Sequence, residues 1–130
     1  KHPFARHRSM PVAQIAREPL IAFDRKDYPD YHEMLDNVFV GTKFKLRIAE
    51  EHDSSTSLIA AIEAGAGVAV CAESLVCTAG LRLKVIPIKP PPAPVIIGAA
   101  WRASGLSPAA MDFLGCAKEV NPTVRSLIER

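Results

Sequence analysis

The sequence lacks the features of several large classes of protein. No apolar run approaches the ~20 residues that a helix needs to cross a bilayer, which argues against a membrane-spanning protein. An excess of one charge is also missing, because 16 basic against 14 acidic residues give a net charge of +2, too near neutral for an extended nucleic-acid footprint. Lys1, Arg6 and Arg8 cluster near the start and are interpreted as a solvated end rather than a DNA-binding arm.

Cysteine is scarce. Cys71, Cys77 and Cys116 are an odd number in a sequence without a signal peptide, so free thiols in a reducing compartment, the cytoplasm, are expected. Cys71 ends an apolar strand pattern and Cys116 lies on the inner half of a helix pattern, where a free cysteine usually behaves as a small hydrophobe. Cys77 is expected to be exposed. No neighbour in sequence identifies an activated thiolate, so a redox switch between Cys71 and Cys77 is kept only as an alternative.

The motifs of metal and catalytic sites are absent. Residues 24–30, "DRKDYPD", lack the glycine and the distal glutamate of a calcium loop. Residues 52–55, "HDSS", place a histidine, an acid and a serine together, but no serine has the flanking glycines of a nucleophile elbow. We therefore predict no metal, no cofactor, no catalytic residue and no enzyme activity. The four histidines have no zinc-site spacing either: His2, His7, His32 and His52.

The sequence does contain alternating strand and helix patterns, which predict an α/β layered fold. The glycines of "GAGVAV", residues 65–70, follow a helix and precede a strand, the reverse of a dinucleotide fingerprint, so they are interpreted as turn residues. In the last helix Met111, Leu114 and Ala117 are expected to face inward. Strands are predicted over 20–23, 43–50, 67–72, 82–88 and 94–101, and helices over 31–40, 54–65 and 107–119.

A polar cluster opens the second predicted helix. Asp53 or Ser54 suits the N-cap, and Ser55, Thr56 and Ser57 follow directly. One cap needs only one such residue, so hydroxyls are left over beside unpaired amides and the positive end of the helix dipole. That arrangement suits a carboxylate or another anion. The alternative is that these residues only start the helix.

A second polar loop is expected at the same edge of the sheet. It follows the strand 20–23 and carries Asp24, Arg25 and Tyr28. If the strands are parallel, this loop and the helix start line one cleft, because ligands of open α/β sheets bind beyond the carboxyl ends of the strands. Arg25 would then offer a bidentate contact to a carboxylate, the alternative being an exposed arginine with no ligand.

The order of several segments resembles the effector-binding domain of LysR-type transcriptional regulators. The resemblance covers almost the whole chain, and its most specific element is "LIAAIEAGAGVAVCAESL", residues 58–75. The segments that carry it are "HPFA" (2–5), "IAREPLIAF" (15–23), "SSTSLIAAIEAGAGVAVCAESL" (54–75), "LKVIPI" (83–88), "IGAAWR" (97–102) and "SPAAMDFL" (107–114).

The resemblance implies a type 2 periplasmic-binding-protein-like fold. Two Rossmann-like α/β subdomains, each with a mixed, mainly parallel sheet flanked by helices, would be joined by two crossing strands and hold an effector between them. Residues 1–16 would follow the first crossover, 17–95 would form the second subdomain, and 96–130 the return crossover and a helical part of the first subdomain. The rest of that subdomain and the N-terminal winged helix-turn-helix are expected to be absent, as in a truncated regulator. The effector cleft would receive Asp24, Arg25, Asp53, Ser54, Ser55, Thr56, Ala100 and Trp101.

The resemblance also implies a function. The chain would be the ligand-sensing domain of a bacterial, cytoplasmic DNA-binding transcriptional regulator whose small effector bears a carboxylate. The full-length protein would form a homodimer or homotetramer, reach DNA only through the N-terminal domain and not bind a membrane. The helix 31–40 is either an association helix or a plain core helix. A solute-binding protein of a transport system is the first alternative, and a thiol-based redox-sensing regulator the second.

Overall fold

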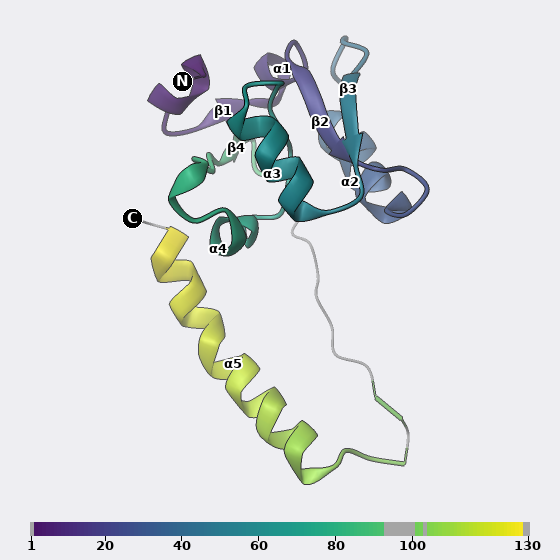
Figure 1. Ribbon diagram of the computed structural model, residues 1–130, viewed down its shortest axis with the longest axis vertical. Helices are drawn as coiled ribbons and strands as arrows, with labels where there is room; N and C mark the ends of the chain where they lie inside the picture. The colour runs from purple at the N-terminus through teal and green to yellow at the C-terminus, as the bar shows by residue number, and fades with distance from the viewer. Residues whose placement is uncertain (1, 93–100, 103, 129–130) are drawn as a thin grey trace. The chain divides into compact units, whose positions relative to one another are not determined.

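The computed structural model describes residues 2–92, 101–102 and 104–128 (Figure 1). The chain divides into two compact units, Lys1–Pro94 and Val95–Arg130. This division falls beside the boundary expected after residue 95, but the assignment of the parts to effector-domain subdomains stays a prediction. Most of the strand predicted over 94–101 lies outside the described residues.

Strands and helices alternate in the first unit, in accord with the predicted α/β class. The second unit contains the helix α5, Pro108–Ile128. The elements of the first unit are η1 (Pro3–Arg6), β1 (Met10–Pro11), α1 (Val12–Ile15), β2 (Pro19–Phe23), α2 (Pro29–Phe39), β3 (Arg47–His52), α3 (Ser55–Glu63), α4 (Leu75–Ala79), η2 (Gly80–Arg82) and β4 (Ile88–Lys89).

Every strand pair in the described residues is parallel. β2 pairs with β3 from Pro19 opposite Arg47 to Phe23 opposite His52. Val68 forms an isolated parallel bridge to the other side of β2, and β1 pairs with β4 in a second two-stranded sheet. The carboxyl ends of β2, β3 and the segment that follows Val68 therefore point the same way.

Burial of β2 organises the core. Its apolar run leaves Leu20, Ile21 and Ala22 at most 1% exposed. Leu20 and Ala22 point to one face, into a cluster that includes Leu35 and Phe39 of α2. Ile21 points to the opposite face, and α3 also packs on β2 (Figure 1). The strand is thus covered on both faces. Since α2 follows β2 and α3 follows β3 after short loops, both helices begin near the carboxyl end of the sheet.

Three predicted strands were too long or misplaced. The strand expected over 43–50 forms over Arg47–His52, because its partner β2 has five residues and the register places Arg47 opposite the first of them. Residues 43–46 therefore have no partner strand despite their alternating pattern. Of the strand expected over 67–72, only the Val68 bridge forms. The strand expected over 82–88 is replaced by β4, Ile88–Lys89, whose partner β1 has only two residues.

The helices are closer to expectation. α2 begins at Pro29, two residues earlier than predicted, because proline suits the first helical position, and Gly41 follows it with a φ of 79°. The expectation that Met111 and Ala117 face inward is wrong, since both are exposed, Met111 by 61%. The described part of the second unit has only α5 and a few loop residues, which offer these side chains little to pack against.

Candidate functional site: the carboxyl edge of the β2–β3 sheet

Parallel pairing brings two polar loops together at one end of the sheet, called here the carboxyl edge. It consists of the loop 24–28 after β2 and the residues 53–57 after β3. The backbone N–H of Asp24 donates to the carbonyl of His52 at 2.9 Å. The hydroxyl of Tyr28 donates to the carbonyl of Asp53, also at 2.9 Å. The parallel arrangement on which the shared edge depended is confirmed.

The cap of α3 uses two of the four hydroxyls. Ser54 is the N-cap, and its Oγ accepts a hydrogen bond from the backbone N–H of Ser57 at 3.3 Å. The Ser57 hydroxyl lies 2.9 Å from the Ser54 Oγ and 3.0 Å from the Ser54 carbonyl oxygen. Ser55 and Thr56 make no side-chain hydrogen bond within the described residues, and their backbone N–H groups begin the helix with no partner one turn back. Two hydroxyls and two amides thus remain for a ligand.

The loop 24–28 is shaped by Asp24. Its Oδ1 accepts hydrogen bonds from the backbone N–H of Lys26 at 2.8 Å and of Asp27 at 3.4 Å. One carboxylate oxygen of Asp24 is therefore engaged in folding its own loop. Arg25, at the tip, is exposed and forms no ion pair among the described residues. Its guanidinium is available at the same edge as α3.

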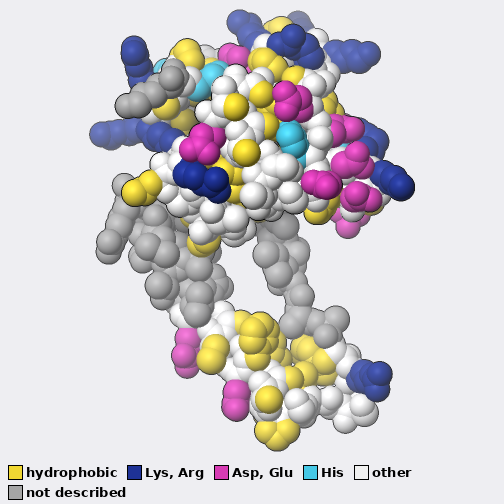
Figure 2. All heavy atoms as spheres, viewed as in Figure 1, with side chains coloured by type: hydrophobic (Ala, Val, Ile, Leu, Met, Phe, Trp, Pro, Cys, Tyr) yellow, Lys and Arg dark blue, Asp and Glu magenta, His cyan; other side chains and the backbone are white. Residues whose placement is uncertain are grey.

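Acidic side chains lie on the last residues of β3 and just after it. Glu50 lies 3.2 Å from the Nε2 of His52, and Glu51 lies 3.7 Å from the Nε2 of His32. Asp53 is exposed next to the N-cap. Figure 2 shows Asp and Glu side chains gathered on one side of the first unit, beside a histidine. The free amides at the start of α3 therefore come directly after an acidic stretch of chain, Glu50, Glu51 and Asp53.

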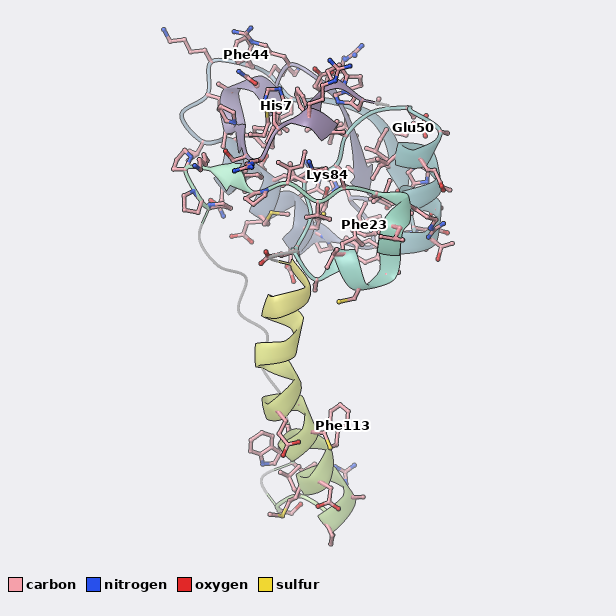
Figure 3. The ribbon with its side chains drawn as sticks, turned by 90° about the vertical axis from the view of Figure 1, so that its left-hand side faces the viewer. His7, Phe23, Phe44, Glu50, Lys84 and Phe113 are labelled. Carbon is pink, nitrogen blue, oxygen red and sulfur yellow. The ribbon has the colours of Figure 1, made fainter. Side chains whose placement is uncertain are left out.

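Beyond Tyr28, which was expected at this edge, the first turn of α2 was missed as part of the site. Its side chains contact the ends of three parallel segments: Tyr28 at Asp53, Tyr31 at the Val70 carbonyl (2.9 Å) and His32 at the Phe23 carbonyl (2.7 Å). The Phe23 ring, labelled in Figure 3, packs on those of Tyr28 and Tyr31 at centroid distances of 4.7 and 5.1 Å. The helical pattern counted Tyr31 only as apolar. The sequence feature that could have revealed this turn is "YPDYH", residues 28–32, which places three hydrogen-bonding rings shortly after a buried strand.

Burial suppresses the acidity of one thiol near this turn. It raises the pKa of Cys71 from 9.0 to about 11, so this thiol is protonated at neutral pH. Burial, followed by the neighbouring Cys71, also raises the pKa of Tyr31 above its usual range. Cys77 is exposed as expected, whereas Cys116 is exposed rather than packed inward. A neutral, half-buried Cys71 is a poor nucleophile, which weighs against the redox-switch alternative.

Alkaline pH is expected to destabilise the protein through Cys71. Because folding raises the pKa of the thiol, its contribution is fully present below pH 9 and disappears as the pH rises towards 11. The loss is on the order of 2–3 kcal/mol at about 1.4 kcal/mol per pKa unit. Urea denaturation of the wild type and of Cys71→Ala between pH 8 and 11 measures it, and the difference between the two should shrink as the pH rises. Parallel curves would contradict the assignment.

A hollow on β3 and two of the predicted site residues are separate from this edge or cannot be placed. A shallow hollow of about 360 Å³ lies along β3, lined by Ile48, Ala49, Glu50 and Glu51, and not at the start of α3. Ala100 lies outside the described residues, and Trp101 belongs to the second unit, where it is 57% exposed.

The described residues contain no cluster of three or more His, Cys, Asp and Glu side chains that could hold a metal ion. No described helix is both long and apolar enough to cross a membrane.

A polar loop and a capped helix start at the carboxyl edge of a parallel sheet are the layout of a ligand-binding α/β domain. The family model of the LysR substrate binding domain matches residues 1–122, and the chain belongs to this family. Comparison with curated proteins and with solved structures gave no significant match. The fold is therefore periplasmic-binding-protein-like, and the domain is a ligand-binding regulatory domain of the LysR type.

Proposed function

We propose that the domain senses a small effector through a carboxylate held at the carboxyl edge. The observation that carries the proposal is the parallel register of β2 and β3, which places the start of α3 beside the loop that bears Arg25. The amides of Ser55 and Thr56, their hydroxyls and the helix dipole would bind the carboxylate. Arg25 would add a bidentate contact, and Asp24, Asp53 and Ser54 would shape the two sides of the site.

The acidic residues near the start of α3 narrow the class of effector that we propose. Glu50 and Glu51 at the end of β3 and Asp53 before the N-cap would disfavour a plain polyanion, because like charges repel. An effector with one carboxylate and a neutral or cationic remainder fits the charges better. Comparison of acetate with glycine, which adds an ammonium group to the same carboxylate, separates these cases.

The regulatory step follows from the coupling between effector binding and the conformational equilibrium of the regulator. An effector changes the arrangement of a regulator only by its difference in affinity between two states, so the site must be more complete in one relative orientation of the subdomains. In the family context the output is transcription: a cytoplasmic, non-catalytic regulator that reaches DNA through a winged helix-turn-helix domain. Ala100 and Trp101 would complete the site from the return crossover.

If α2 takes part in association as a homodimer or homotetramer, it would do so through its polar face. Leu35 and Phe39 are buried inside the first unit, which favours the interpretation of α2 as a core helix. Glu33, Asp36 and Asn37 are exposed on its other face.

Replacing Ser55 by proline is expected to weaken carboxylate binding without unfolding α3. Ser55 is the first helical residue, where proline is tolerated, and the extended φ and ψ of Ser54 (−146° and 156°) suit a residue before proline. The change removes one hydroxyl and one amide donor, so affinity should fall about tenfold or more, against about threefold for Ser55→Ala, which keeps the amide.

A thermal-shift screen of the wild type against acetate, glycine, benzoate and succinate finds the ligand, and titration compares the variants. Thr78→Val removes an exposed hydroxyl from a different helix, α4, and serves as the matched control. Equal affinity of Ser55→Pro and wild type for a bound carboxylate would reject the site. No shift with any of the four compounds would reject carboxylate sensing by this chain.

A further inference from the structure

Two hydrogen bonds join the loops of the carboxyl edge. The first is between backbone groups, Asp24 N–H to the His52 carbonyl. The second comes from a side chain, since the hydroxyl of Tyr28 donates to the Asp53 carbonyl. Asp53 immediately precedes the N-cap Ser54, so the second bond acts two residues before Ser55, whose amide is the first at the start of α3.

We propose that Tyr28 is a positioning residue that sets the distance between the Arg25 loop and the start of α3. This inference rests on the proposed function of the carboxyl edge. Tyr28 is the N-cap residue of α2 and its ring packs on Phe23 at the end of β2, so its own place is determined by the sheet. Its hydroxyl then reaches out of this anchored ring and holds the chain just before α3.

A role in core packing alone does not explain the position of Tyr28. The side chain is 38% exposed and lies outside the core cluster. Tyr31, one turn further along α2, is the natural comparison, because its hydroxyl bonds the Val70 carbonyl in a partly buried setting. The two tyrosines make the same type of bond with the same atoms. They differ in which segment they hold and in how deeply they lie.

The experiment compares Tyr28→Phe with Tyr31→Phe, since each change removes one hydroxyl and keeps the ring. Amide hydrogen exchange is followed by NMR at Ser57 and Leu58, whose N–H groups bond Ser54, and at Val68, whose N–H bonds the Pro19 carbonyl. Tyr28→Phe should speed exchange at Ser57 and Leu58 by about three- to tenfold and leave Val68 unchanged. Tyr31→Phe should do the reverse and lower Tm more.

Binding is measured in parallel by titration with benzoate. Tyr28→Phe should weaken binding about three- to tenfold, and Tyr31→Phe should bind as the wild type does. The same exchange pattern in both variants, or unchanged exchange at Ser57 and Leu58 in Tyr28→Phe, would overturn the proposal. Wild-type affinity in Tyr28→Phe alongside weaker binding in Ser55→Pro would overturn it too and leave the proposed function intact. No benzoate binding by the wild type, with the exchange pattern as expected, would count against that function and not against the positioning of α3.

Discussion

Gly67→Ala is expected to destabilise the first unit by about 3 kcal/mol or more, with a fall in Tm of about 12–24 °C. A Cβ at this buried position would overlap the Pro19 carbonyl oxygen and lie 3.1 Å from the Pro19 carbonyl carbon. Backbone atoms at the start of β2 cannot swing away as a flexible side chain can. The Val68 N–H also donates to the Pro19 carbonyl at 3.0 Å, so the overlap would displace the bridge between Val68 and β2.

Gly65→Ala is the matched control for this prediction. Gly65 has a φ of 86°, which disfavours alanine by about 1–2 kcal/mol, but a Cβ there would meet open space. Thermal unfolding followed by circular dichroism ranks the two variants. An equal or greater loss of stability in Gly65→Ala would show that the approach to Pro19 is not what requires glycine at position 67.

This glycine pair illustrates what sequence patterns resolve. Both glycines were predicted to serve a turn, which is right for Gly65, since it ends α3 with positive φ. The requirement at Gly67 comes from Pro19, a residue of another strand. No local pattern contains that contact, because it exists only after β2 and the segment around Val68 have paired.

The strands show the same limit. The buried strand β2 was predicted to within one residue, since a short apolar run between polar segments needs no partner to be recognised. The pattern of alternating residues over 43–50 indicated a strand but not its ends. The five-residue length of β2 and the register with Arg47 determine those ends, and neither is encoded in residues 43–50 themselves.

The candidate site was predictable as a place but not as a set of contacts. The capping chemistry of residues 53–57 and the parallel topology were enough to indicate the edge where α3 begins. They placed Tyr28 in the loop at this edge but gave no reason to single out Tyr31 and His32. The partners of the three rings are carbonyls at the ends of three different segments. The division of the four hydroxyls into cap and spare also required the geometry.

His32→Ala is expected to lower the free energy of unfolding by about 3–4 kcal/mol. His32 is 1% exposed, and the change would remove a buried ring together with its hydrogen bond to Phe23. Because a carbonyl oxygen only accepts, the Nε2 of His32 must carry the proton in that bond. The Nδ1 atom is buried without a partner among the described residues, so in the neutral ring it is an unsatisfied acceptor.

His32→Phe separates the ring from its nitrogen atoms. It keeps a buried aromatic ring, somewhat larger than imidazole, loses the bond to Phe23 and also removes the cost of the unpartnered Nδ1. Its expected loss is therefore about 1–2 kcal/mol, smaller than that of alanine. Urea denaturation of both variants gives the two values. A loss below about 1 kcal/mol for His32→Ala would mean that α2 does not depend on this ring. A loss in His32→Phe as large as that in His32→Ala would instead mean that a buried ring alone does not hold α2 at the carboxyl end of β2, and that the nitrogen atoms and the smaller size of imidazole are required.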